Sequence, residues 1–154
     1  IRLSLVGSEM CIRDSPYIDI SQKNKLSQNK QAGARKKPER VEGTLSCELP
    51  KTLVKKNDIH ITSKRNFDCF QDTELDMLLK RTLNVKNIII CGVNTDTCVY
   101  GTTFGASNRG YNPIVIECCT GSMRGEDQHI TALKIMSQSI AWVMKKEEIL
   151  NKLN

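Results

Sequence analysis

Asn87–Tyr111 reads NIIICGVNTDTCVYGTTFGASNRGY, and the rest of the chain is best interpreted outward from this stretch. Its apolar run from Ile88 to Cys91 is typical of a strand in a parallel sheet that is buried on both faces. Gly92 and the polar residues after it end the strand. The pattern predicts a buried strand that leads directly into a new element.

The element after this strand reads as a helix. Thr95 or Asp96 is a suitable N-cap, and Gly110 is a suitable C-terminal stop. Cys98 then lies in the first helical turn, where amide N–H groups and the helix dipole favour a thiolate over a thiol. The segment alone leaves two interpretations of Cys98, a reactive nucleophile and a small core residue.

Composition limits the classes of protein to consider. The chain has 154 residues, of which 39% are hydrophobic and 26% charged, which suits one soluble domain with a core. Because no apolar stretch approaches the roughly 18 residues of a membrane span, we expect no membrane helix. Seven cysteines without a C-x-x-C pair indicate neither a disulfide framework nor a zinc module. We therefore expect a reduced, cytoplasmic protein without a metal or cofactor.

The formal net charge of +6 is concentrated near the N-terminus. Gln22–Arg40 has seven basic residues, one acidic residue and no aromatic residue. A surface for nucleic acid is one interpretation, but bases usually stack on aromatic side chains, which this stretch lacks. We expect a solvated loop and no nucleic-acid partner.

Residues 1–15 differ from the rest of the chain. Glu9–Ser15 can be back-translated into a sequence that resembles the transposase end used in DNA library preparation. We interpret residues 1–15 as a translated adapter and residues 16–154 as a single domain truncated at its N-terminus. The alternative is a genuine strand at Leu3–Val6.

The remaining pattern alternates strands and helices. Strands are predicted at 58–63, 87–91, 112–117 and 141–144, and helices at 74–83, 126–139 and 146–153, with a surface connection at 16–42, a short turn or helix at 45–49 and a loop at 120–125. This alternation favours an α/β domain with a mainly parallel sheet. Lys64 follows one strand and Cys98 the next, so a right-handed crossover brings both to the same edge of the sheet.

Other candidate residues have simpler interpretations. Gly101 and Gly105 lie inside a helix, so they indicate close helix–sheet packing and not a phosphate loop. His60 and His129 stand singly, which favours surface or core roles over metal binding. Cys118 and Cys119 have a redox role as one interpretation, but we expect them to be buried, apolar cysteines at a strand end. The same expectation holds for Cys47, Cys69 and Cys91.

These residues together resemble the isochorismatase-like cysteine hydrolases. Gly92–Tyr111 is similar to that family's nucleophile segment, Ser63–Leu79 to its lysine segment, and Val41–Thr44 to a third motif. Tyr17–Ser21 resembles the preceding connection. The C-terminal IAWVMKKEEIL resembles, less specifically, a subgroup of amidases for carbamoyl and ureido compounds. The resemblance covers about residues 16–150.

The resemblance implies a Rossmann-like three-layer α/β/α fold and an Asp–Lys–Cys triad. It assigns Cys98 as the nucleophile, Lys64 as the neighbouring cation, a cis peptide at Val93–Asn94, and an oxyanion hole at the amides of Asn94 and Cys98. Phe70 and Thr97 are expected to line the substrate pocket.

Two positions depart from the family pattern. The family's aspartate belongs to a first strand upstream of Pro16, so we expect both to be missing here and this fragment to be inactive or impaired. Asp19 does not match that position. Cys118 stands where the family commonly has an acidic residue, which affects pocket contacts and not the nucleophile.

The implied activity is hydrolysis of a C–N bond in a small amide, carbamoyl or ureido compound through a thioester, by a protein that is expected to form homo-oligomers. The alternatives are an isochorismatase-type vinyl-ether hydrolase and a non-catalytic fragment or scaffold.

Overall fold

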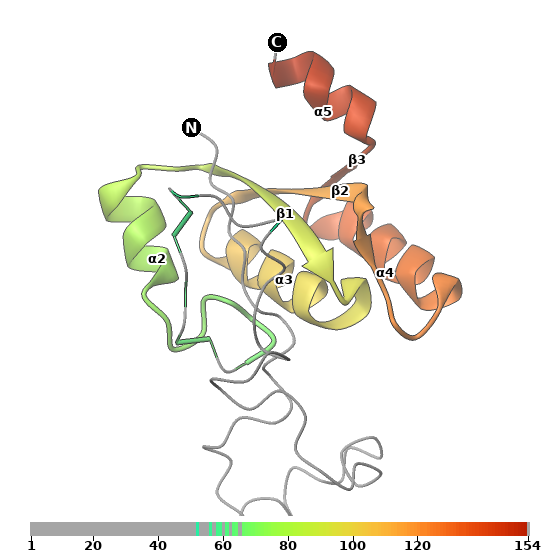
Figure 1. Ribbon diagram of the computed structural model, residues 1–154, viewed down its shortest axis with the longest axis horizontal. Coiled ribbons are helices and arrows are strands. Elements are labelled where there is room, and N and C mark those ends of the chain that lie inside the picture. Colours follow the sequence, from blue (N-terminus) through green and yellow to red (C-terminus); the bar gives the residue numbers. More distant parts are fainter. Residues whose placement is uncertain are drawn as a thin grey trace, which may run out of the picture.

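The computed structural model describes residues 66–153 and seven residues upstream of them, namely Thr52, Lys56, Asp58, Ile59, Ile61, Ser63 and Lys64. Figure 1 shows the order of the elements. They are α2 (Leu75–Met77), η4 (Leu78–Thr82), β1 (Asn87–Val93), η5 (Thr95–Val99), α3 (Tyr100–Asn108), β2 (Asn112–Gly121), α4 (Glu126–Ser139), β3 (Trp142–Met144) and α5 (Lys146–Leu153), where η4 and η5 are π-helical turns.

The three strands form one parallel sheet in the order β1-β2-β3. Each crossover passes through a helix, α3 between β1 and β2 and α4 between β2 and β3. These two helices contact one another and lie on the same side of the sheet (Figure 1). The predicted α/β fold with a parallel sheet is therefore confirmed, and all three strands end at one edge.

The core lies between the sheet and its helices. Ile88 and Ile90 are buried, whereas Ile89 between them is 40% exposed and Cys91 is also exposed. Strand β1 thus alternates, and the prediction that both its faces are buried is wrong for the described residues. Successive side chains point to opposite faces of a strand, and α3 and α4 cover only one of them. The core cluster comprises Phe70, Leu75, Leu79, Ile88, Ile90, Val99, Ala106, Tyr111, Val115, Ala132, Leu133 and Met136.

Several predicted elements are present at nearly the predicted bounds, including β1, α4, β3, α5 and the helix now divided into α2 and η4. Strand β2 is longer than predicted. Thr120 and Gly121, predicted as loop, pair with Gly92 and Val93 beyond an irregularity in the register. This irregularity lets β2 resume pairing after its apolar segment, which pattern reading cannot anticipate.

Other predictions are corrected or lie outside the described residues. The described positions of 58–63 (Asp58, Ile59, Ile61 and Ser63) are not in a strand, and we have no physical account of this. The spacing of Ile130, Leu133, Met136 and Ile140 predicts one buried stripe on α4, but Ile130 is 54% exposed and the buried residues are Ala132, Leu133 and Met136. The predictions for residues 1–51, and those for His60 and Cys47, lie outside the described part of the chain. Within that part, no helix is both long and apolar enough to cross a membrane.

Candidate active site

The candidate nucleophile follows a sharp turn at the carboxyl end of β1. The Val93–Asn94 peptide bond is cis, at the position where the resemblance implied one. Asn94 has an extended conformation and precedes η5, whose residues include Cys98. The Cys98 side chain is buried, with 4% of its surface exposed. A nucleophile in this position would be sheltered from bulk water.

Backbone hydrogen bonds define the turn around Cys98. The Asn94 carbonyl accepts from the amides of Thr97 and Val99, each at 3.1 Å. These two amides flank the Cys98 amide in the chain. The bond from Val99 spans five residues, which makes the turn π-helical and wider than an α-helical one. The sequence predicted an α-helical first turn, and the structure corrects this.

The predicted helix caps have other partners. The N-cap position is Asn94, and its side chain makes no capping hydrogen bond. The Thr95 hydroxyl lies 2.8 Å from Nδ1 of His129 on α4. Asp96 accepts a hydrogen bond from the Ser122 hydroxyl and pairs with the Arg124 guanidinium. Both residues predicted as caps therefore tie the turn to the chain after β2.

The loop between β2 and α4 thus holds the turn at residues 94–99, which we call the nucleophile turn after its candidate nucleophile Cys98. In addition to the contacts of Asp96, the Asn94 side-chain carbonyl accepts from the Met123 amide at 2.9 Å. Burial works against ionisation of Asp96, but the hydrogen bonds from Ser122 and Arg124 hold its pKa below the ordinary value. The sequence predicted a loop at 120–125 but not that it would hold this turn. Its position after the strand neighbouring β1, at the same sheet edge, was the available signal.

The lysine segment lies along the helix that carries Cys98. Lys64 is buried, with 4% of its surface exposed, although lysines are seldom buried unless paired. A few residues later, the Phe67 backbone packs so closely on α3 that a Cβ on Gly101 would lie 3.3 Å from it. The Thr102 hydroxyl donates to the Phe67 carbonyl and accepts from the Cys69 amide.

The contact surface lies on α3, the helix that continues directly from the turn containing Cys98. Gly101 and Gly105 are four residues apart within α3, and such spacing places them on one helical face. A Cβ on Gly105 would lie 2.6 Å from the carboxylate carbon of Asp68. The two glycines therefore admit the lysine segment, not the sheet as predicted. This packing brings the chain after Lys64 alongside the Cys98 helix.

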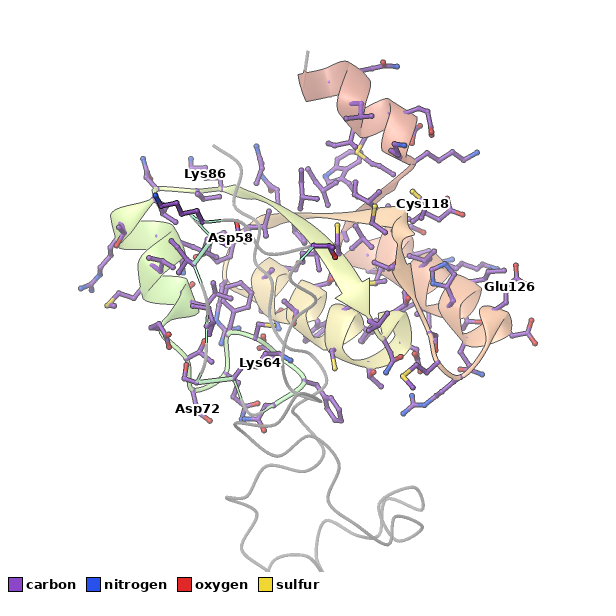
Figure 2. All side chains as sticks on the ribbon, in the orientation of Figure 1. Asp58, Lys64, Asp72, Lys86, Cys118 and Glu126 are labelled. Carbon is purple, nitrogen blue, oxygen red and sulfur yellow. The ribbon has the colours of Figure 1, made fainter. Side chains whose placement is uncertain are left out.

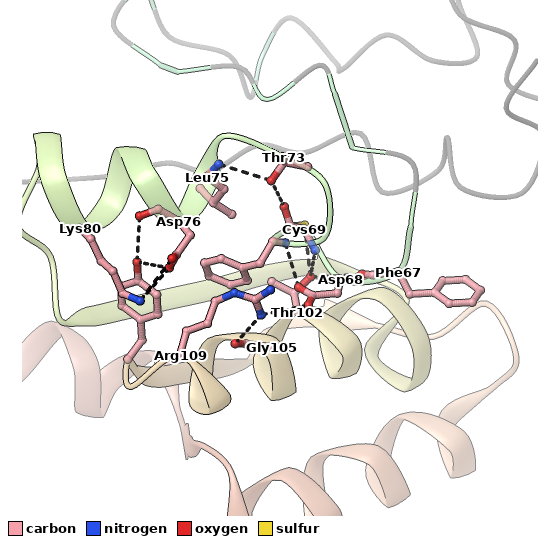
Figure 3. A network of polar contacts seen from close by, with 12 residues as sticks. Phe67, Asp68, Cys69, Thr73, Leu75, Asp76, Lys80, Thr102, Gly105 and Arg109 are labelled. Atoms are coloured by element: carbon pink, nitrogen blue, oxygen red, sulfur yellow. Dashed lines mark hydrogen bonds and ion pairs between the residues drawn. The ribbon is translucent and has the colours of Figure 1, made fainter. Parts of the chain in front are cut away.

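A polar network fixes the lysine segment on this face (Figure 3). The Asp68 carboxylate accepts from the Phe70 amide at 2.8 Å and pairs with the Arg109 guanidinium at 3.3 Å. Arg109 also donates to the Gly105 carbonyl and lies over the Phe70 ring, 4.9 Å from its centroid. The network joins the loop to both ends of the same helix face.

A second set of contacts anchors α2 to the end of α3. The Tyr111 hydroxyl donates to the Asp76 carboxylate at 2.9 Å, and Asp76 also pairs with Lys80 at 3.2 Å. Burial, together with the bond to Asp76, raises the pKa of Tyr111. The spacing of Thr73 and Asp76 predicts a capping box, but Asp76 bonds to Tyr111 and Lys80 and Glu74 is the N-cap. The Thr73 hydroxyl donates to the Cys69 carbonyl and accepts from the Leu75 amide.

Comparison with known proteins shows which family this chain resembles. A profile described as the isochorismatase domain matches residues 13–148.

The chain belongs to the isochorismatase family.

Known members of the isochorismatase family show how far this similarity extends. An uncharacterised isochorismatase family protein of Escherichia coli O157:H7 is 33% identical over 97 residues, which are 63% of this chain and 50% of that protein. The crystal structure of an isochorismatase-like hydrolase from Alkaliphilus metalliredigens has a TM-score of 0.70 at 25% identity, covering 75% of this chain and 62% of that one. A nicotinamidase from Staphylococcus aureus has a TM-score of 0.52 at 34% identity, covering 57% and 54%. The chain spans about half the length of the curated relative.

Phe70 and Thr97, the two residues predicted to line the substrate pocket of this isochorismatase family member, lie in different parts of the structure. Phe70 is 4% exposed and stacks on Tyr111 at 5.5 Å between ring centroids, so the structure places it in the core. Thr97 is half-buried in the turn beside Cys98. The pocket roles of these two residues stay predictions. The acidic member of the triad was expected upstream of Pro16, outside the described residues.

The described cysteines differ from expectation, whereas His129 agrees with it. Cys91, Cys118 and Cys119 are exposed and Cys69 is half-buried, so the prediction that they are buried is wrong. Figure 2 shows Cys118 on β2, well away from Lys64. His129 is half-buried and bonded to Thr95, as a satisfied histidine should be. No three His, Cys, Asp or Glu residues in the described part of the chain are grouped to hold a metal ion.

Proposed function

We propose that this isochorismatase family member is a cysteine hydrolase that cleaves the C–N bond of a small amide, carbamoyl or ureido compound. The observation that supports the proposal best is the packing of the lysine segment on α3, the helix that continues from the Cys98 turn, at Gly101, Thr102 and Gly105. In the proposed site Lys64 lies next to Cys98, where its positive charge would favour the thiolate.

In the proposed reaction the Cys98 thiolate attacks the substrate carbonyl. The proton of the thiol passes to the triad carboxylate expected upstream and then to the leaving nitrogen, so that ammonia or an amine departs and a thioester remains. Water adds to the thioester carbonyl and releases the acid, and the thiol is restored. Overall, one water is consumed for each C–N bond broken.

Charge on the carbonyl oxygen develops in both steps. We assign its stabilisation to the backbone amides of Asn94 and Cys98 and to the Lys64 ammonium. Preorganised donors of this kind contribute about 3–4 kcal/mol each where they have been removed by mutation.

The substrate class rests partly on relatives. Solved structures similar to this chain include a nicotinamidase from Staphylococcus aureus, at 34% identity, and N-carbamoylsarcosine amidase from Thermoplasma acidophilum, whose 23% identity supports the fold alone. We therefore propose a planar amide or carbamoyl group as the reacting part.

The test is to incubate the full native chain with a panel of amides and to measure turnover as the release of ammonia. Cys98→Ala is expected to abolish turnover, and Lys64→Met to lower kcat by about 10²–10³-fold, as the loss of one oxyanion donor does. Cys91→Ser removes an exposed thiol that has no role in the proposed reaction and is the matched control, with activity expected to be retained. Mass spectrometry of a quenched reaction should detect an acyl group on Cys98.

Retained turnover in Cys98→Ala would refute the nucleophile. Turnover of a vinyl ether such as isochorismate, with no acyl-enzyme formed, would instead favour the alternative hydrolase. Absence of turnover by the native chain on every substrate would favour a non-catalytic scaffold.

A further inference from the structure

Three exposed cysteines lie on two neighbouring strands of the sheet. Cys91 belongs to β1, and Cys118 and Cys119 belong to the neighbouring strand β2. The Cys119 side chain is hydrogen-bonded to both of the other thiols. Figure 2 labels Cys118 on β2. The proposed hydrolysis uses none of these thiols.

The pairing of β1 with β2 is irregular at these cysteines. Ile90 pairs with Val115 and Gly92 pairs with Thr120. On β1 only Cys91 therefore lies between these pairs, opposite residues 116–119 of β2. The local bulge re-aims side chains, as bulges do. It accounts for a contact between Cys91 and a residue so far along β2.

Geometry distinguishes the two pairs that Cys119 could form. Neighbouring strands lie about 4.8 Å apart, which is within the 4.4–6.8 Å between Cα atoms that a disulfide spans. Cys118 and Cys119 are adjacent in the chain, and Cα atoms joined by a trans peptide are about 3.8 Å apart, below that range. The pair across the strands is therefore the favourable one.

We propose that Cys91 and Cys119 are a thiol pair that forms a reversible cross-strand disulfide by exchange with a low-molecular-weight disulfide. Metal binding is the other use of clustered thiols, but the described residues hold no group of three ligands suited to it. The pair lies just upstream of the Val93–Asn94 bond, so the disulfide would join β1 to β2 near the nucleophile turn.

The exchange takes place in two steps. One protein thiolate attacks a sulfur of the small disulfide, forms a mixed disulfide and displaces one small thiolate. The second protein thiolate then attacks the protein sulfur of the mixed disulfide and displaces the other small thiolate. Two protein thiols are oxidised, one small disulfide is reduced to two thiols, and the two protein protons end on those thiols.

Cys91 is expected to attack first. Burial, together with the Cys118 neighbour, raises the pKa of the Cys119 thiol, although Cys91 and the nearby Lys146 act in the opposite direction. A raised pKa leaves less thiolate available for attack. The Cys119→Ser variant should therefore accumulate a mixed disulfide at Cys91.

The experiment treats the full chain with glutathione disulfide, alkylates the remaining thiols and digests with trypsin without reduction. Cleavage after Lys86, Arg109 and Arg124 places Cys91 on the peptide 87–109 and both β2 cysteines on 110–124. Mass spectrometry should find these two peptides linked, and dithiothreitol should separate them. Fragment ions between Cys91 and Cys98 identify which of these two is joined.

Variants make the outcome decisive. Cys91→Ser and Cys119→Ser should each lose the linked peptides, whereas Cys118→Ser should keep them at the wild-type yield. Links through Cys98 or Cys118, or mixed disulfides alone in the wild-type chain, would overturn the proposal. Disulfide mapping needs no turnover, so its result is independent of the proposed hydrolase activity.

Discussion

The contact between Gly105 and Asp68 gives a sharp test of how the lysine segment is held. A Cβ added at Gly105 would lie 2.5 Å from Oδ1 and 2.6 Å from Cγ of Asp68. The carboxylate would have to rotate away, and it would lose the Phe70 amide at 2.8 Å and the Arg109 guanidinium at 3.3 Å. Gly105→Ala should therefore displace the loop that follows Lys64.

The size of the effect follows from the hydrogen bond and the ion pair that would break. A hydrogen bond to a charged group contributes about 1.5–3 kcal/mol, and a partly exposed ion pair about 0–1 kcal/mol. Replacing glycine by alanine inside a helix by itself stabilises the folded state by about 0.5–1 kcal/mol, which offsets part of this loss. We expect Gly105→Ala to lower the free energy of unfolding by about 1–3 kcal/mol, measured by urea denaturation at constant m-value.

A double-mutant cycle isolates the clash. In the Asp68→Ala background the carboxylate is gone, so Gly105→Ala should become neutral or slightly stabilising. Gly121→Ala is the matched control, because its new Cβ would have only Val93 Cγ1 nearby, at 3.9 Å. An equal loss from Gly105→Ala in both backgrounds would refute the packing argument. In the native chain the single variant should also lower kcat, by displacing the Lys64 segment.

Three further variants test the surrounding structure by denaturation. Arg124→Gln should lower the free energy of unfolding at neutral pH, because it removes the partner of the Asp96 carboxylate. The pKa of Asp96 lies below its ordinary 3.8 in the folded protein, so the difference between variant and wild type should disappear as the pH falls below about 4 and Asp96 becomes protonated. A difference that does not change with pH would contradict the pairing. Tyr111→Phe should cost about 1–2 kcal/mol, because its hydroxyl donates to a carboxylate, and an unchanged denaturation midpoint would argue against that bond. Met136→Ala, at a fully buried site, should cost about 2–5 kcal/mol, whereas Met123→Ala, 70% exposed, should change little; similar losses would contradict the described core.

Much of the fold could be predicted because its signals are local. The apolar run before Gly92 and the position of Gly110 set the bounds of elements through short-range chemistry. Alternation of strands with helices then predicted a parallel sheet. The crossover rule also predicted Lys64 and Cys98 at one edge, but it relied on a strand at 58–63, whose described positions are not in a strand, so this placement stays a prediction. The resemblance added the roles of these residues, which remain proposals.

What pattern reading could not supply depends on contacts between distant segments. Spacing indicated close packing at Gly105, but only the tertiary structure shows that the neighbour is Asp68 and not the sheet. The helix caps were assigned to Thr95 and Asp96 because such residues usually serve that role, yet both bond to the chain after β2. A side chain with two available partners cannot be assigned from its own neighbours alone.

By itself, then, the sequence determined an α/β chain with a cysteine placed after a buried strand. Periodicity and end signals act within a few residues, so they are visible in one dimension. The tertiary structure decided which face of β1 is covered, which loop holds the nucleophile turn, and that Cys91 meets Cys119 across a bulge. Burial and pairing are properties of surfaces brought together from distant positions, and only folding specifies them.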